Sequence, residues 1–245
     1  MTDAWYHAEA AVRWVRARAG VRLAQDRRLV GTSSATLAVV PLASPRIQVI
    51  LASTRPGRFG EKPAAWLMDR LYTRTDLAAE LIDLRDYPLP IFDQPAPPAR
   101  TLRDYPNEGI ARWGRTLDEA DGFVVVTPEY NHGYPASLKN ALDYVFPELN
   151  RKPIAFVGYG NVGGARAIEQ LRLVAVEFEM APLRHAIHIL PELMVAAMNA
   201  DPFTPDLFAP LDGRLDVAAT DLAWWASTLA AARSESTTGT GSPQL

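Results

Sequence analysis

Apolar positions along the chain follow two alternating patterns. Five segments are strand-like, and the first is apolar nearly throughout, as expected for a strand covered on both faces. They are residues 47–53, 79–84, 122–127, 153–158 and 183–190. Elsewhere apolar residues recur at helical spacing, as in Ala64, Leu67, Met68 and Leu71; Ile110, Trp113, Leu117 and Ala120; Leu138, Ala141, Leu142 and Val145; Ile168, Leu171, Ala175 and Phe178; and Ala218, Leu222, Trp225 and Leu229. This alternation predicts an α/β fold, with a parallel sheet and helices on both of its faces.

The same pattern divides the chain into one main domain and two flanking segments. We expect the domain to span residues 46–232, and residues 233–245 have the composition of a disordered tail. Residues 1–45 are predicted to form a short amphipathic helix followed by a linker. Arg27 and Arg28 outline a twin-arginine export signal, but Pro41 interrupts the apolar part, so we expect a cytoplasmic protein.

The charge and the residue composition exclude several kinds of partner and site. The net charge of -3 and the pI near 5.8 give no electrostatic case for binding nucleic acid or an anionic membrane surface. The partner expected is therefore a small molecule or another protein. No cysteine is present, so disulfides, thiolate nucleophiles and cysteine metal sites are excluded, and redox chemistry would need a bound cofactor. We expect no metal site and no transmembrane segment.

Residues 156–164 contain a glycine motif that suggests dinucleotide binding at first. Gly158, Gly160 and Gly163 form G-x-G-x-x-G between a strand and a helix. In a dinucleotide fold this motif follows the first strand, with an acidic residue about 20 positions later at the end of the second strand. Here it follows the fourth strand, and Glu177 and Glu179 fall in a predicted helix, so the position argues against that fold. The chain also lacks a G-x-S-x-G nucleophile elbow and a Walker loop.

The loop after the first strand has the groups that bind phosphate. The sequence STRPGRFG at residues 53–60 leads into a helix and supplies hydroxyls, backbone N–H groups and guanidinium groups. The residues concerned are Ser53, Thr54, Arg55 and Arg58. The alternative is a turn whose arginines are simply solvated.

The loop after the third strand suits a planar heteroaromatic ring. The sequence PEYNHGYP at residues 128–135 combines prolines, a glycine, two tyrosines, an asparagine and a histidine around Glu129. Such a loop offers rigid backbone donors and acceptors for a ring edge and flat side chains for its face. In the glycine loop, missing side chains would let the backbone approach the same ligand. Alternatively, residues 128–135 form an ordinary surface turn.

Together these stretches resemble the NADPH-dependent FMN reductase family, which includes bacterial quinone, azo and chromate reductases. The resemblance covers about residues 46–190 and is carried by STRPGR, PEYNHGYPASLKNALDYV and GYGNVGG. It implies a flavodoxin-like five-stranded parallel sheet, FMN as cofactor and NAD(P)H as electron donor. The implied phosphate contacts are Ser53, Arg55, Arg58, Phe59 and Gly60, and the implied ring contacts are Pro128, Glu129, Tyr130, Asn131, His132, Tyr159, Gly160, Gly163 and Gly164. The family often has glycine in place of Ala52 and a small hydroxyl residue in place of Arg58.

We predict no catalytic acid or base among these residues. Hydride can pass directly from nicotinamide to flavin, so His132 is interpreted as a ring-edge or substrate contact rather than a proton carrier. Glu129 is expected to contribute its backbone. Lys139 and Asp143 are four residues apart on a helix and can pair with each other or with a neighbouring subunit.

The family resemblance also implies an oligomer. Tyr144 and Phe146 extend the apolar surface of the helix predicted at residues 137–147, and a second subunit could bury them. We therefore expect a homodimer or homotetramer, with the prolines of residues 88–98 shaping the mouth of the pocket. Ser137 is the expected cap of this helix.

The function predicted is hydride transfer from NAD(P)H through FMN to a small acceptor, such as a quinone, an azo or nitro compound, or a metal oxyanion. The first alternative is a flavodoxin-like electron carrier serving a protein partner, although such carriers are usually much more acidic than this chain. The second is a binding or regulatory protein of the same fold that has lost flavin. The sequence does not distinguish NADH from NADPH.

Overall fold

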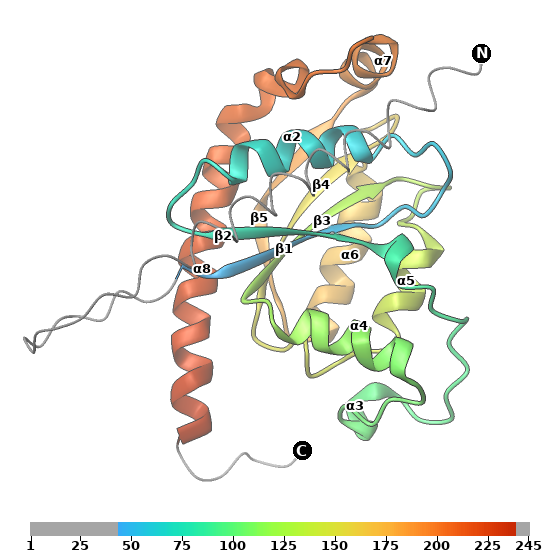
Figure 1. Cartoon of the computed structure of the whole chain (residues 1–245), viewed down its shortest axis with the longest axis vertical. Coiled ribbons are helices and arrows are strands. Elements are labelled where there is room, and N and C mark those ends of the chain that lie inside the picture. The colour runs from blue at the N-terminus through green and yellow to red at the C-terminus, as the bar shows by residue number, and fades with distance from the viewer. Residues whose placement is uncertain (1–43, 239–245) are drawn as a thin grey trace, which may run out of the picture.

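The computed structural model describes residues 44–238, and these form a five-stranded parallel sheet (Figure 1). The spatial order is β2-β1-β3-β4-β5, which is the flavodoxin-like order, as predicted. The strands are β1 (Arg46–Leu51), β2 (Ala78–Asp83), β3 (Gly122–Pro128), β4 (Pro153–Tyr159) and β5 (Ala181–Ile189). All five lie where the apolar pattern places them. Of the helix and linker predicted at residues 1–45, residues 1–43 lie outside the described residues.

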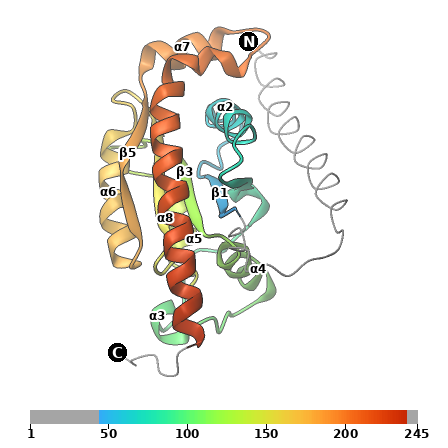
Figure 2. The same cartoon turned by 90° about the vertical axis from the view of Figure 1, so that its left-hand side faces the viewer.

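Helices cover both faces of the sheet, and each face has its own hydrophobic core (Figures 1 and 2). Helices α2 (Glu61–Leu71) and α8 (Asp212–Thr238) pack on one face. Helices α4 (Glu108–Asp118), α5 (Ala136–Leu142) and α6 (Ala165–Glu177) pack on the other. Alternating residues of β1 supply both cores: Val49 points to the α2 side, and Ile50 points to the α4 side.

Two helix ends differ from the prediction, and one helix is additional. Helix α5 ends at Leu142 instead of continuing to residue 147. Helix α7 (Pro191–Asn199), which was not predicted, follows β5 with Pro191 in its first turn, where a missing N–H costs nothing. Helix α8 continues to Thr238, past the predicted start of the tail at residue 233. Arg233 donates to the carbonyl of Arg151 and to Asp121, and extending a helix that is already anchored is easier than nucleating one.

The segment between β2 and α4 is mostly irregular, as its prolines predict. Its regular parts are short: the 3₁₀ turn η2 (Leu84–Asp86) and the single helical turn α3 (Pro98–Thr101). A second 3₁₀ segment, η3 (Pro205–Leu211), links α7 to α8. None of the helices in residues 44–238 is both long enough and apolar enough to cross a membrane.

Candidate functional site

Three loops meet at one edge of the sheet because the carboxyl ends of parallel strands share that edge. They follow β1, β3 and β4 and, with one residue of α7, enclose a cleft of about 260 Å³. Its walls are Arg55, Pro56, Gly57, Arg58 and Phe59; Pro128, Glu129 and Tyr130; Tyr159 and Gly160; and Met194. The volume lies near the lower end of the range for small-molecule pockets. Most of the predicted residues therefore converge on one site.

Arg58, one of the predicted phosphate contacts, has a buried guanidinium group that is bound to other groups of the protein. Its side chain is 1 % exposed and forms a bidentate pair with Asp83, the last residue of β2. Its Nε donates to Glu61 at 3.0 Å, and Nη1 donates to the carbonyl of Ser53 at 2.5 Å. The charge of Arg58 is thus balanced inside the protein. Its role there is to hold the loop.

The Arg58 cluster also contains Arg85, which lies in η2. Arg85 donates to Glu61 at 3.2 Å and to the carbonyls of Thr54 and Arg55. Burial raises the pKa of Asp83, but hydrogen bonds and the charges of Arg58 and Arg85 outweigh it, so the pKa lies below its ordinary value. Asp83 is therefore a carboxylate at neutral pH. Two cations and two anions form a cluster without net charge.

Arg55 is exposed within the loop that follows β1. Its guanidinium carbon lies 5.5 Å from the ring centroid of Tyr130, on the opposite loop. The Tyr130 hydroxyl is in turn 2.8 Å from the Ser53 hydroxyl, which is buried. Thr54 faces a separate hollow beside Arg85 and so does not line the cleft. Of the predicted phosphate contacts, Arg55 is the side chain free to meet an anion there.

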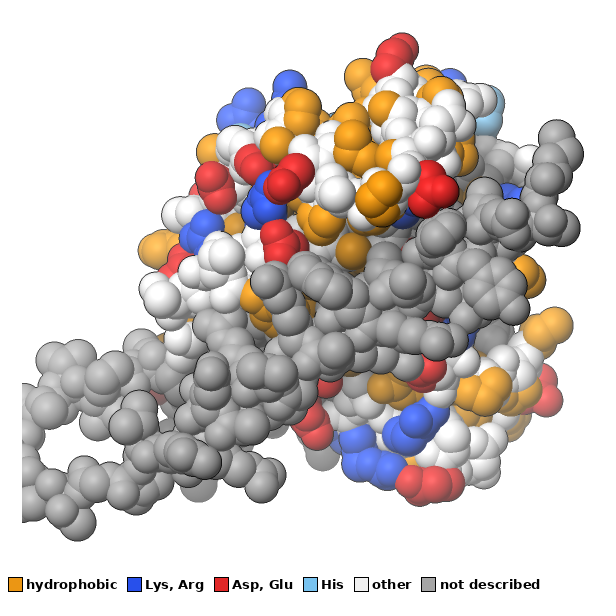
Figure 3. Space-filling view, turned by 45° about the horizontal axis from the view of Figure 1, so that its top comes forward, with side chains coloured by type: hydrophobic (Ala, Val, Ile, Leu, Met, Phe, Trp, Pro, Cys, Tyr) orange, Lys and Arg blue, Asp and Glu red, His pale blue; other side chains and the backbone are white. Residues whose placement is uncertain are grey.

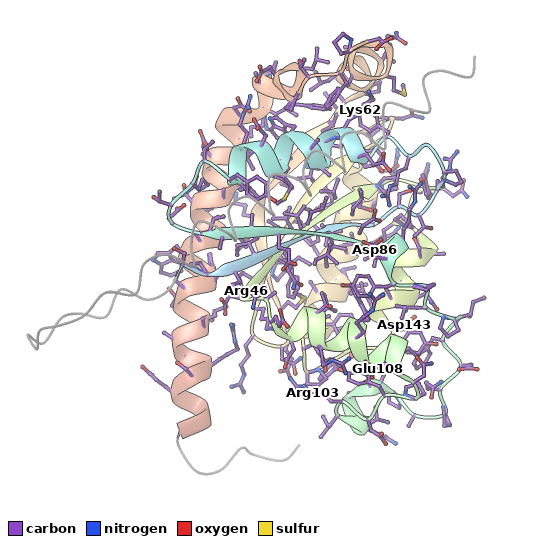
Figure 4. The ribbon with its side chains drawn as sticks, in the orientation of Figure 1. Arg46, Lys62, Asp86, Arg103, Glu108 and Asp143 are labelled. Atoms are coloured by element: carbon purple, nitrogen blue, oxygen red, sulfur yellow. The ribbon has the colours of Figure 1, made fainter. Side chains whose placement is uncertain are left out.

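Lys62 is a further cation at the start of α2, but it is directed elsewhere (Figure 4). Its Nζ lies 4.4 Å from the ring centroid of Phe203, in the segment between α7 and η3. Burial lowers the pKa of Lys62, while the charge of Asp201 opposes that shift. Lys62 is not among the residues that line the cleft.

The start of α2 packs closely on Tyr159. A Cβ at Gly60 would lie 2.7 Å from the Tyr159 hydroxyl, so only glycine fits at this position. The Tyr159 ring packs 5.1 Å from Phe59, centroid to centroid, and its hydroxyl is buried with no hydrogen-bond partner among the described residues. Burial raises the pKa of this hydroxyl, which is therefore protonated at neutral pH. Gly60 thus allows Tyr159, a residue of the cleft wall, to pack against the start of α2.

The loop after β3 is a tight turn held by its own backbone. The N–H groups of Tyr130 and Gly133 each donate to the carbonyl of the other residue, at 2.8 and 3.0 Å. The two central residues, Asn131 and His132, have φ angles of 49° and 68°, which is the pattern of a type I′ turn. Both central side chains are exposed, and the His132 carbonyl accepts from Gln170. Neither side chain lines the cleft.

Glu129 uses its carboxylate to cap α6 rather than to face a ligand as a base. It accepts from the backbone N–H of Arg166 at 3.1 Å and pairs with the Arg166 guanidinium at 2.6 Å. Burial raises the pKa of Glu129, but Arg166 more than offsets it, and the pKa is below its usual value. A carboxylate held in this way is a poor proton acceptor at neutral pH.

The three glycines of the loop after β4 have different surroundings. Gly160 lines the cleft, whereas Gly163 and Gly164 shape the turn behind it. A Cβ at Gly163 would lie 2.7 Å from His188, and one at Gly164 would lie 2.7 Å from Gly158. Both residues also have positive φ angles, of 64° and 72°. Their lack of side chains allows close packing within the protein.

The helix after the β3 turn links the site to its surroundings. Ser137 does not cap α5 as predicted, because its hydroxyl donates to the Ala52 carbonyl just before the first loop. Asn140 binds the proline-rich segment through the Pro90 carbonyl and the Phe92 N–H. Lys139 pairs with Asp143 at 2.5 Å, which is one of the two predicted arrangements.

Tyr144 is not available to a second subunit. It is 3 % exposed, and its hydroxyl lies within hydrogen-bonding distance of the carbonyls of Pro90 and Ile91. The proline-rich segment therefore covers this part of the chain. Residues 88–98 are not among those that line the cleft in the described part of the chain, and Pro88 and Leu89 line the neighbouring hollow beside Thr54.

Sequence reasoning missed Asp83, Glu61, Arg85 and Met194. Asp83 ends a buried strand, and a carboxylate in that place signals a buried cation nearby. Met194 comes from the unpredicted helix α7. No group of three or more His, Asp or Glu side chains in residues 44–238 is placed to hold a metal ion.

The chemistry of the cleft fits a molecule with an anionic end and a flat ring. The anionic end would meet Arg55 and the N-terminus of α2. The ring would meet Pro128, Tyr130 and Gly160, whose surfaces are flat or lack a side chain. FMN has both parts.

Comparison with known proteins also indicates FMN. Residues 45–192 match the model of the NADPH-dependent FMN reductase family. An NAD(P)H-dependent FMN reductase of Schizosaccharomyces pombe is 39% identical over 161 residues, which cover 65% of this chain and 80% of that protein. A 2-hydroxy-1,4-benzoquinone reductase of Burkholderia is 30% identical over 142 residues, covering 55% of this chain and 72% of that protein.

The fold is also that of a solved flavoenzyme. The NAD(P)H:(acceptor) oxidoreductase FerB of Paracoccus denitrificans superposes with a TM-score of 0.58 at 23% identity, covering 75% of this chain and 98% of that one. The family match covers the first strand, all three loops and the last strand. The chain therefore belongs to the NADPH-dependent FMN reductase family.

Proposed function

We propose that the cleft between the β1, β3 and β4 loops holds FMN and that the chain uses it to reduce a quinone-like acceptor with NAD(P)H. The observation that carries this proposal is the convergence of Arg55, the α2 N-terminus and the flat walls at Pro128 and Gly160 on one cleft. When bound, FMN would take hydride from the nicotinamide and pass two electrons to the acceptor. The role of the protein is binding, orientation and electrostatics.

The phosphate end of this site would lie at the segment 53–60. Arg55 supplies a charge-assisted hydrogen bond, and the N–H groups of Gly57 and Phe59 have no acceptor among the described residues. Helix α2 adds the positive end of its dipole. Arg58 would hold the loop in place through its hydrogen bond to the Ser53 carbonyl.

The ring end would lie against the β3 turn and the start of the glycine loop. Pro128 and Gly160 offer backbone surface without bulk, and Tyr130 provides an aromatic edge. Met194 gives a polarisable apolar contact from α7. Residues 131 and 132 would lie outside the direct contacts, and no acid or base of the chain is assigned a proton-transfer role.

A quinone is the acceptor class we favour over azo compounds, nitro compounds and metal oxyanions. The benzoquinone reductase of Burkholderia supports this choice by its name. The cleft wall facing the ring end is apolar and aromatic at Tyr130 and Met194, which suits a flat neutral molecule better than a metal oxyanion.

We also propose a homodimer acting in the cytoplasm. Helix α7 exposes Val195 and Met198 about half each, beside Leu190, and apolar side chains are visible among charged ones in the upper part of Figure 3. Exposed apolar surface next to a cofactor site is often covered by another subunit. A monomeric mass in sedimentation equilibrium at micromolar concentration would contradict the dimer.

The test of function is an anaerobic experiment on the protein loaded with FMN. Addition of NADH or NADPH should bleach the flavin absorbance. Addition of 1,4-benzoquinone to the same sample should then restore it. Comparison of the two donors at equal concentration identifies the preferred one. Binding of FMN without bleaching by either donor would instead support an electron carrier.

A further inference from the structure

Three consecutive carbonyls of the first loop accept hydrogen bonds from two arginines. Arg58 Nη1 donates to the carbonyl of Ser53, and Arg85 donates to the carbonyls of Thr54 and Arg55. These acceptors are the backbone immediately before Pro56 and Gly57, where the chain turns toward α2. The oxygens of three successive peptide units are thus held by guanidinium groups.

The arrangement affects how the loop meets an anion. A carbonyl oxygen carries partial negative charge, and an oxygen facing the cleft would repel a phosphate group. In a planar trans peptide the N–H group points away from the carbonyl of the same unit. The Arg55 N–H group, however, donates to the Ser53 hydroxyl at 3.4 Å and Pro56 has no N–H group, so the effect of the Arg85 contacts is to keep the carbonyl oxygens of Thr54 and Arg55 from facing a bound phosphate.

The two arginines have no net charge to offer a ligand. Asp83 and Glu61 balance them, with side chains 5 % and 2 % exposed. Glu61 Oε1 accepts from both guanidinium groups, at 3.0 and 3.2 Å. Since Glu61 is the first residue of α2 and Asp83 is the last residue of β2, the cluster fixes the loop between a helix and a strand.

We propose that Arg85, together with Arg58, is a positioning residue that sets the preference of this site for phosphorylated over unphosphorylated flavin. Arg85 does not line the cleft, and it acts on the phosphate only through the carbonyls of Thr54 and Arg55. This inference rests on the proposed function, because it assigns the cleft to FMN. It explains how a loop in which the Arg58 charge is already balanced can still accept an anion, because the carbonyl oxygens of Thr54 and Arg55 are held away from the cleft.

The test compares the binding of FMN and riboflavin, which differ by the phosphate, to the full chain. Arg85 is the better target because its side chain is 30% exposed, whereas Arg58 is fully buried and its loss can prevent folding. Arg85→Gln should weaken FMN binding about tenfold and leave riboflavin binding unchanged. Arg85→Lys retains a cationic donor and should restore part of the preference.

The matched control is Arg112→Gln. Arg112 donates to the Asp86 carbonyl in the same segment as Arg85 and stacks on Tyr87, but it does not reach the first loop. The Arg112→Gln variant should bind FMN and riboflavin with unchanged affinity. Melting temperatures of all variants show whether each one is folded.

The outcomes distinguish failure of the positioning role of Arg85 from failure of the proposed FMN site. Equal weakening of FMN and riboflavin by Arg85→Gln, or no change in either, would overturn the positioning role while leaving the FMN site in place. A wild-type chain that binds neither flavin would overturn the proposed function and the inference with it. Loss confined to FMN, with partial recovery in Arg85→Lys, is the result expected.

Discussion

The loops after β1 and β3 face the same cleft but are held in opposite ways. The first is fixed by buried side chains, with Arg58 and Arg85 bound to its carbonyls. The second is fixed by its own backbone, through the reciprocal hydrogen bonds of Tyr130 and Gly133. Side-chain chemistry therefore determines the first loop, and backbone conformation determines the second.

This difference explains why similar residues have different roles. Arg55 and Arg58 are three positions apart, yet one is exposed on the cleft wall and the other is 1 % exposed beside Asp83. In the β3 turn, by contrast, Asn131 and His132 are present where φ is positive and their side chains point to solvent. Substitutions should be costly in the first loop and mild in the second.

The largest effect is expected from removing Asp83. Asp83→Ala leaves the Arg58 charge buried without its bidentate partner, and it should lower the free energy of unfolding by about 3 to 5 kcal/mol. Urea denaturation followed by tryptophan fluorescence measures the change. As a control, Glu108→Ala breaks an exposed pair with Arg115 at the start of α4 (Figure 4) and should cost less than about 1 kcal/mol. Equal losses for the two variants would show that burial of the Asp83 pair does not matter.

A smaller effect, on binding alone, is expected at Arg55. Arg55→Ala should weaken FMN binding by about 1.5 to 3 kcal/mol, the range for a hydrogen bond to a charged group, with the unfolding free energy unchanged. Isothermal titration with FMN measures it. An unchanged affinity would mean that the phosphate lies elsewhere in the cleft.

The pH dependence of stability should reflect Asp83 as well. Its pKa is below the ordinary value of 3.8 in the folded protein, so its contribution to stability is present above pH 3.8 and is lost as the pH falls through the lower, folded-state value. The stabilities of the wild type and Asp83→Asn, measured by urea denaturation, should therefore converge as the pH is lowered below about 4. A difference that stays constant down to pH 2 would contradict the ionised pair.

The smallest effect is expected in the β3 turn. His132→Gly places a residue that tolerates positive φ at a position where φ is 68°, and it should change the unfolding free energy by no more than about 0.5 kcal/mol. Its effect on FMN affinity and turnover should also be small, because the side chain lies outside the cleft. A large loss of turnover would give His132 the catalytic role that the structure does not assign to it.

Much of the fold was predictable because apolar periodicity is a local signal. All five strands and the α2, α4, α6 and α8 faces follow from it. Helix α7 was missed because it is short and its apolar residues are partly exposed, so its periodicity is weak. The end of α8 was missed because its stability comes from Arg233 binding Arg151 and Asp121, which are distant in sequence.

The meeting of the three loops at one cleft was predictable, but the orientation of individual side chains was not. Arg58 has the residue type and spacing of a phosphate contact, and only the position of Asp83 beside it shows that its charge is already balanced. Gly163 likewise has the spacing of a ligand-binding glycine, but His188 occupies the space its side chain would need. Such contacts join different strands, and no local pattern records them.

The most direct test of this account is a crystal structure of the chain with FMN. We predict the phosphate within hydrogen-bonding distance of Arg55 and the backbone N–H groups at the start of α2, with the ring between Pro128 and Gly160. Arg58 should still be paired with Asp83 and should not touch the ligand. A phosphate bound directly to the Arg58 guanidinium, or a flavin outside this cleft, would contradict the account.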